Sequence, residues 1–288
     1  MDATQVRAIG CHGQTVRHRP PSGSASAIEA FTLQIADPNT IAERTGIPTV
    51  ADFRRRDIAA GGEGAPLAPA FHAAAFARAG TARAIVNIGG IANVSLLDGE
   101  QWTGGFDSGP GNTLLDLWTR RHRGERYDRQ GSWAASGQVL PKLLDHLLRD
   151  DYFSLSGPRS TGKETFNLGW LDARLTQFAG SDPSDIQATL AELTAASIAD
   201  AIGNSSLAVD EIYVCGGGAH NTDLLARLDK RLPGAALNST AALGIEPDWV
   251  EAVTFAWLAH RTLNGLAGNA PAVTGASGER VLGAIYPG

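Results

Sequence analysis

The sequence of 288 residues has few cysteines and no strongly basic stretch, and each absence excludes a class of protein. Cys11 and Cys215, the two cysteines, are far apart and lack the spacing of metal ligands. A disulfide framework is therefore not expected, and a reducing compartment is favoured. Lys and Arg are interspersed with Asp and Glu at a net charge of −6, so neither nucleic acid nor a membrane surface is an expected partner.

Long hydrophobic runs and several catalytic motifs are also missing. No apolar run approaches about 18 residues, and the first residues carry no basic and apolar signal-peptide pattern, so we expect a cytoplasmic location. The chain has no HExxH, CxxC or Gly-x-Ser-x-Gly motif, and zinc protease and serine hydrolase activities therefore have no support.

Glycine, in contrast, is abundant and clustered. The 34 glycines exceed the average usage of about 7%. Four clusters stand out: Gly61–Gly62, Gly89–Gly90, Gly104–Gly105 and Gly216–Gly218. Three of the four follow or split apolar, strand-like runs. Glycines at strand ends allow a backbone to approach a ligand closely.

Strand-like and helix-like segments alternate along the chain, which predicts an α/β fold. A helix is expected from Pro38 to a stop at Gly46, with Asp37 as its N-cap. Residues 83–99 are predicted to form a hairpin, and Pro141 is predicted to break the helical segment 132–150. The clearest amphipathic helix covers residues 182–202, and a mostly apolar helix is expected over 248–265.

Two glycine turns are candidate anion sites. In "VNIGGIANVSLL" (86–97), Gly89 and Gly90 would let backbone N–H groups face an anion, with Asn93 as a flanking polar group. In "VCGGGAHN" (214–221), a strand enters Gly216–Gly218 before a helix that starts near Thr222, whose N-terminus favours a phosphate. Ordinary tight turns are the alternative for both segments.

Asp107 lies in "GGFDSGPGNTLLD" (104–116), which is so rich in glycine and proline that a loop is expected there. A carboxylate on a stiff turn beside an anion site suits a general base that deprotonates water or a hydroxyl. The alternative is an Asx turn, in which Asp107 caps its own loop.

The segment around "RRRDIAAGGEGAPLAP" (54–69) contains candidate substrate ligands. Arg54 and its neighbours could bind carboxylates or phosphates bidentately, and Asp57 follows them. A solvated charge run is the alternative. His12 and Gln14 come just after a predicted strand end and could recognise hydroxyls, although a buried, hydrogen-bonded histidine is equally consistent.

Together these segments resemble the anhydro-N-acetylmuramic acid kinase family over nearly the whole chain. The resemblance is carried, in family order, by "IGCHGQTV", "TLQIADPNTIAERTGIPTVADFRRRDIAAGGEGAPLAPAFH", "NIGGIANVSLL", "GGFDSGPGNTLLD", "STGKETFNLGWL", "DIQATLAELTAASIA", "VCGGGAHN" and "PAVTGAS". It implies a two-lobed sugar-kinase/Hsp70/actin-like (ribonuclease H-like) α/β fold. Residues 1–80 would be the rest of the substrate-side lobe, and residues 81–288 the second lobe.

The resemblance also implies an activity. Family members use ATP and Mg²⁺ to hydrolyse the 1,6-anhydro ring of anhydro-N-acetylmuramic acid and phosphorylate O6, in peptidoglycan recycling. Asp107 would be the general base, and the two glycine turns would bind the phosphates and adenosine of ATP. The implied sugar ligands are His12, Gln14, Arg54, Asp57, Asn93, Gly109 and Glu251. A homodimer is expected, and no metal-ligand cluster is predicted.

One family feature is not found in the sequence. Family members begin with a glycine-rich segment resembling "GTSxDG" that binds the β- and γ-phosphates, and nothing similar occurs here. The chain is expected to correspond to the family from about 80 residues onward, a length near that of a small half-domain, so its first lobe would be incomplete. The alternative function is therefore a sugar-binding homologue without ATP-dependent activity.

Overall fold

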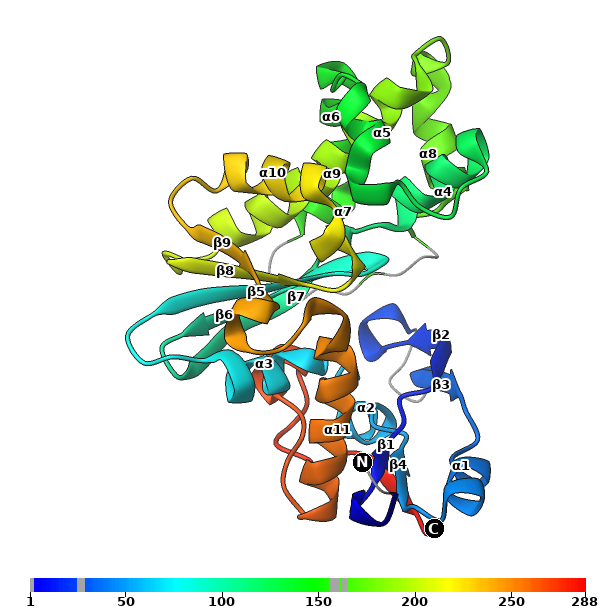
Figure 1. Ribbon diagram of the computed structural model, residues 1–288, viewed down its shortest axis with the longest axis vertical. Coiled ribbons are helices and arrows are strands. Elements are labelled where there is room, and N and C mark those ends of the chain that lie inside the picture. Colours follow the sequence, from blue (N-terminus) through cyan, green and yellow to red (C-terminus); the bar gives the residue numbers. More distant parts are fainter. Residues whose placement is uncertain (1–2, 25–28, 156–160, 162–164) are drawn as a thin grey trace. The chain divides into compact units, whose positions relative to one another are not determined.

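The computed structural model describes residues 3–24, 29–155, 161 and 165–288, and the chain divides into two compact units (Figure 1). Unit 1 comprises Met1–Phe76 and Trp249–Gly288, and unit 2 comprises Ala77–Asp248. The first boundary lies close to the expected one near residue 80. The assignment of residues 249–288 to the second lobe differs from this division, because α11 (Val250–Leu263) packs on β1 and α3, and β10 (Ala284–Tyr286) pairs with β4.

Unit 1 contains a small mixed sheet with the strand order β1-β4-β10. β1 (Ile9–Gly10) runs parallel to β4 (Thr49–Ala51), and β10 pairs with β4 antiparallel. A separate two-stranded ribbon joins β2 (Gln14–Arg19) to β3 (Phe31–Ile35). The core consists mainly of residues from β4, the segment that follows it, α11 and the C-terminal segment: Val50, Phe53, Leu67, Phe255, Leu258, Ala259 and Leu282.

The helices of unit 1 agree in part with the predicted ones. α1 (Pro38–Thr45) has the predicted bounds, with the Asp37 side chain accepting from the Thr40 N–H and Gly46 in the left-handed conformation. α3 covers Ala68–Phe76, and α12 (Pro271–Thr274) is short. The segment 54–69, which holds the candidate substrate ligands, contains a short helix, α2 (Arg55–Ala59).

Unit 2 is built on a five-stranded sheet with the order β7-β6-β5-β8-β9. The predicted hairpin is confirmed as β5 (Ala82–Ile88) and β6 (Ile91–Asp98), which pair antiparallel, while β8 runs parallel to β5. The other strands are β7 (Gln101–Pro110), β8 (Glu211–Cys215) and β9 (Ala236–Ser239).

The described part of unit 2 contains seven α-helices: α4 (Thr113–Arg123), α5 (Ser132–Ser136), α6 (Pro141–Leu148), α7 (Asp151–Ser154), α8 (Leu168–Leu175), α9 (Pro183–Gly203) and α10 (Thr222–Arg231). α9 and α10 pack on one face of the sheet, where Val86, Val94 and Val214 meet Ile198 and Leu224 (Figure 1). The N-terminal half of α9 packs into a second core with α4, α5, α6, α7 and α8. Pro141 begins α6, which confirms the predicted break.

The segment from Gly104 to Pro110 is part of strand β7, so the expected loop was wrong. β7 is an edge strand, and an edge strand tolerates proline because one side of its ladder needs no partner. Two register irregularities against β6 absorb the unusual residues, one of them between Ala92 and Asn93. The predicted catalytic acid therefore lies on a bulged strand and not on a free turn.

Candidate functional site

The strand register of unit 2 aligns Asp107 with a row of polar side chains. Cys215 of β8 pairs with Asn87 of β5, Asn87 pairs with Asn93 of β6, and Asn93 pairs with Asp107 of β7. Successive side chains of a strand alternate between faces, and Val86 and Val94 face α9, so this row occupies the opposite face. Asp107 is 9% exposed.

Among the described residues, Tyr152 and Thr161 donate hydrogen bonds to Asp107 from segments distant in the sequence. The Tyr152 hydroxyl donates to the Asp107 main-chain oxygen at 2.7 Å, and the Thr161 N–H donates to Oδ2 of the carboxylate at 2.9 Å. Gly109 follows on the same strand, where an added Cβ would lie 2.8 Å from Cε1 of Phe153. Packing of β7 against α7 therefore requires glycine at position 109.

The Gly89–Gly90 turn is fastened to the N-terminus of α4. The Gly89 oxygen accepts from the Asn112 N–H at 2.8 Å, and the Gly90 oxygen accepts from the N–H groups of Gly111 and Thr113. The Asn112 side chain also donates to the Ile88 oxygen at 3.0 Å. An added Cβ at Gly89 would meet the Ile91 oxygen only at 3.4 Å, an ordinary contact, so packing alone does not demand glycine there.

The three glycines after β8 differ in what their surroundings require. Gly216 has a φ of 76°, and an added Cβ would lie 2.4 Å from Oδ1 of Asn87. A Cβ at Gly218 would lie 2.3 Å from Cγ2 of Ile88. At Gly217, in contrast, the nearest atom of the described residues is Nδ2 of Asn112 at 3.8 Å. Gly216 and Gly218 are required by the fold, whereas Gly217 faces open space.

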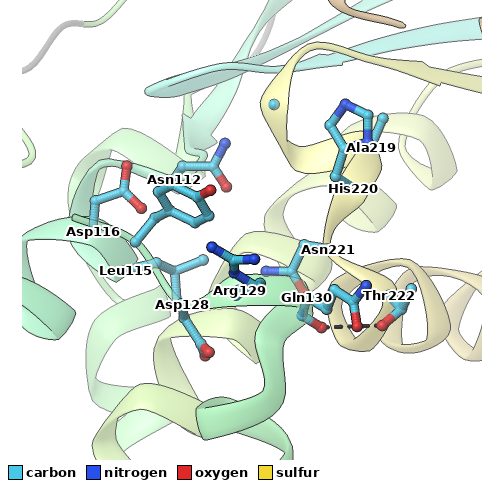
Figure 2. A pocket seen from close by; sticks show the side chains of 12 residues that line it. Asn112, Leu115, Asp116, Asp128, Arg129, Gln130, Ala219, His220, Asn221 and Thr222 are labelled. Atoms are coloured by element: carbon cyan, nitrogen blue, oxygen red, sulfur yellow. Dashed lines mark hydrogen bonds between the residues drawn. The ribbon is translucent and has the colours of Figure 1, made fainter. Parts of the chain in front are cut away.

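That open space is a cavity of about 710 Å³ within unit 2 (Figure 2). α4 contributes Asp116 to its wall, and the segment from Gly217 to the start of α10 forms another part. Figure 2 shows Ala219 and His220 across the cavity from Asp116, with Arg129 and Gln130 also at its edge. The Thr222 hydroxyl donates to the Gln130 oxygen at 3.1 Å and joins two sides of the cavity. As predicted, a helix begins at Thr222.

Two predicted sugar ligands of unit 1, His12 and Arg54, are connected by a hydrogen bond. The Arg54 Nε donates to Nε2 of His12 at 3.0 Å, and Nη1 of Arg54 donates to the Gly64 oxygen at 2.9 Å. Nδ1 of His12 lies 2.8 Å from the Gly13 oxygen and is therefore the protonated nitrogen. Burial, together with the adjacent Arg54, lowers the pKa of His12 to about 4, so its ring is neutral at pH 7.

Asp57 lies behind this network and is fully buried. Its Oδ2 accepts from the Gly64 N–H at 2.8 Å, and its Oδ1 accepts from Nδ2 of Asn269 and Oγ1 of Thr274, both at 2.8 Å. The carboxylate is thus surrounded by donors of the chain itself. Asp57 thereby fixes Gly64, whose oxygen accepts from Arg54, and its direct contact with a sugar stays a prediction.

Two other predicted sugar ligands of unit 1 lie apart from the His12–Arg54 network. Gln14 begins β2, where its side chain is exposed and donates to the Thr15 oxygen. Glu251 is exposed on the first turn of α11. Neither residue hydrogen-bonds to His12 or Arg54 in the part of the chain that the structure describes.

Comparison with known proteins decides the family. A family model described as anhydro-N-acetylmuramic acid kinase matches residues 1–288. This chain belongs to the anhydro-N-acetylmuramic acid kinase family. The anhydro-N-acetylmuramic acid kinase of Pseudomonas putida is 55% identical over 98% of this chain and 76% of the relative. The one from Shewanella loihica is 55% identical over 100% of this chain and 77% of the relative. Family membership predicted from the motifs is confirmed.

A solved structure with a similar chain is component A of the (R)-2-hydroxyglutaryl-CoA dehydratase from Acidaminococcus fermentans. It matches 74% of this chain and 77% of its own at 14% identity, with a TM-score of 0.41. The mixed α/β class predicted for this member of the kinase family is confirmed by its own sheets and helices.

Sequence reasoning missed several residues around the candidate site. Tyr152 and Thr161 contact Asp107 from 45 and 54 positions away, and no local pattern signals such a contact. Asn112 was not among the candidate residues. Its position directly after Gly111 in a glycine-rich segment was the available signal for a residue that holds the Gly89 turn and lines the same cavity as Gly217.

Within the described ranges, no three His, Cys, Asp or Glu side chains gather as a metal site. No helix in that part of the chain has the length and hydrophobicity needed to span a bilayer. The motif "STGKETFNLGWL" begins at Ser160, so its first part lies largely outside the described residues.

Proposed function

We propose that this chain converts 1,6-anhydro-N-acetylmuramic acid, water and ATP into N-acetylmuramic acid 6-phosphate and ADP. Family membership supports the substrate and the reaction. The observation that carries the proposal within the structure is the register that places Asp107 beside Asn93 and Asn87, in the same unit as both glycine turns. A kinase that also opens a ring needs a base and a phosphate site close together.

Asp107 acts as the general base in this proposal. Its carboxylate takes one proton from water while the water oxygen bonds to C1 of the sugar. The C1–O6 bond breaks, and its electron pair stays on O6. O6 then forms the bond to the terminal phosphorus of ATP, ADP leaves, and the proton on Asp107 returns to solvent. Ring opening thus produces the phosphoryl acceptor in place.

Two observations are consistent with ATP and a hydrated Mg²⁺ binding to the residues of unit 2. Oδ1 of Asn93 is buried and has no hydrogen-bond partner among the described residues, as expected of a group that meets a ligand. Gly217 borders the 710 Å³ cavity with room for a further atom. Gly89, Gly90 and Gly217 would lie along the phosphates and adenosine, with Gly216 and Gly218 shaping the turn. Bound ATP supplies the phosphoryl group, and Mg²⁺ neutralises its charge.

His12 and Arg54 are the proposed sugar-side contacts of unit 1. Arg54 could bind the lactyl carboxylate of the substrate, because its guanidinium is already oriented by His12 and Gly64. We retain Gln14, Asn93 and Glu251 as proposed sugar ligands. Asp57 and Gly109 take supporting roles, since one is fully buried and the other is packed against Phe153.

The first test is ATP-dependent conversion of anhydro-N-acetylmuramic acid by the 288-residue chain, followed by ADP release and by the ³¹P signal of the sugar 6-phosphate. Both products should form in equal amounts. ADP release without sugar phosphate, or sugar binding without turnover, would overturn the proposal and favour a binding protein. A cytoplasmic homodimer is proposed from the family resemblance alone, and sedimentation velocity tests the dimer.

A further inference from the structure

We infer that Tyr152 is a positioning residue for Asp107, an inference that rests on the proposed base role of Asp107. The Tyr152 hydroxyl donates to the main-chain oxygen of Asp107 at 2.7 Å. Both residues are buried, with exposed fractions of 8% and 9%. Since the hydroxyl contacts the backbone and not the carboxylate, its effect on the reaction is to fix where the carboxylate lies.

The bulge in β7 explains why Asp107 needs this hydrogen bond. Asp107 pairs with Asn93 and Gly109 pairs with Ala92, so Ser108 is an extra residue opposite β6. A bulge interrupts the ladder locally and re-aims the neighbouring side chains. Ser108 donates its hydroxyl to the Ala92 oxygen at 3.2 Å, and Tyr152 supplies the donor to the Asp107 oxygen. The two hydroxyls stabilise the bulged geometry from both sides.

Tyr152 is itself held rigidly enough to impose a position. Its N–H donates to Oδ1 of Asp150, the N-cap of α7, at 3.0 Å. Oδ2 of Asp150 accepts from the side chains of Trp170 and Arg174 of α8. The Tyr152 ring meets the ring of Phe166 edge-on, with 5.4 Å between centroids and an interplanar angle of 87°.

The neighbour of Tyr152 contacts the same stretch of β7. An added Cβ at Gly109 would lie 2.8 Å from Cε1 of Phe153, so the Phe153 ring presses directly on the strand. α7 therefore contacts β7 at two points, a polar one at Asp107 and an apolar one at Gly109. Removing the Tyr152 hydroxyl keeps the apolar contact and deletes only the polar one.

Tyr152→Phe should lower kcat about tenfold, because a general base displaced by a fraction of an ångström loses much of its rate advantage. KM for the sugar and for ATP should stay unchanged, since no substrate contact is removed. Tyr213→Phe is the matched control: the Tyr213 hydroxyl donates to Oε2 of Glu211 at 3.0 Å in the same unit. That variant should keep the kcat of the unsubstituted chain.

A second readout does not depend on activity. The carbonyl ¹³C resonance of Asp107 should shift in Tyr152→Phe and not in Tyr213→Phe, because only the first loses the hydrogen bond. A lower melting temperature with unchanged kcat, or an unchanged Asp107 carbonyl resonance, would overturn the inference. Turnover by the unsubstituted chain is the separate test of the proposed function, so an unchanged kcat in an active chain contradicts only the role of Tyr152.

Discussion

The predicted site residues of the two units are held in position in different ways. In unit 1, side chains hold one another: Asp57 holds the Gly64 N–H, Gly64 accepts from Arg54, and Arg54 donates to His12. In unit 2, the backbone supplies most of the site, through two glycine turns and a bulge beside Asp107. The difference teaches that a substitution in unit 1 should affect stability first, whereas one at Asp107 should affect rate first.

The largest expected effect is that of Asp107→Asn in unit 2. Turnover should fall by about 10²–10⁴-fold, the range that a general base contributes, because the amide cannot accept the proton from water. Sugar binding, measured by calorimetry, should stay nearly the same. An equal loss of binding and turnover would contradict the base role of Asp107. It would also remove the expected difference between unit 2, where rate should change first, and unit 1, where stability should change first.

In unit 1, Asp57→Asn should lower the free energy of unfolding by about 3 kcal/mol. The buried carboxylate accepts from three donors, and an amide would turn one acceptor into a donor that faces another donor. Glu43→Gln is the control, because Glu43 is exposed on α1 and should change stability by less than about 0.5 kcal/mol. Urea unfolding of both variants measures the difference. Equal stability would show that Asp57 does not organise unit 1.

Within the glycine turn after β8, Gly218→Ala and Gly217→Ala should behave differently. Gly218→Ala should cost about 2 kcal/mol of stability, because the new methyl group would overlap Ile88. Gly217→Ala should keep stability within about 0.5 kcal/mol, since its methyl group meets open space, and should weaken nucleotide binding. Thermal melts with and without ATP separate the two effects. Similar losses of stability would contradict the distinction between them.

The smallest expected effect is an acid sensitivity of unit 1. Burial lowers the pKa of His72 to about 3, so the folded ring stays neutral while the unfolded ring gains a proton below about pH 6.5. The contribution of His72 to the free energy of unfolding is therefore fully present above pH 6.5. It is lost as the pH falls, by about 1 kcal/mol at pH 5.5 for one histidine. His72→Phe should reduce this loss by that amount, and His260→Gln, an exposed control, should not.

Local patterns predicted the elements that local forces decide. Asp37, Pro38 and Gly46 fixed α1 because a cap, a restricted φ and a left-handed stop all act within one turn of chain. The same reasoning failed at Gly104–Pro110, where pairing with β6 outweighs poor strand propensity. Local patterns also gave no sign that residues 249–288 would pack in unit 1, because this packing depends on partners far away in the sequence, such as Asp57, which lies 212 positions from Asn269.

The candidate site was predictable as a set of residues but not as an arrangement. The glycine clusters marked both turns, yet only the Cβ positions separate Gly217 from Gly216 and Gly218. His12 and Arg54 were predicted separately, and their hydrogen bond follows from the fold. Asp57 illustrates the reverse case: its charge suggested a sugar ligand, whereas its complete burial is the observation behind the supporting role proposed for it.

Helix α9 links the stability of unit 2 to the strand that carries Asp107. Its 21 residues run through both hydrophobic cores of the unit. Midway, the Thr194 hydroxyl lies 3.0 Å from the oxygens of Pro110 and Gly111, where β7 ends. Amide hydrogens of α9 should therefore exchange with solvent only when the whole unit opens. The end of β7 should share that slow exchange, so the proposed base should lose its place only when the unit unfolds as a whole.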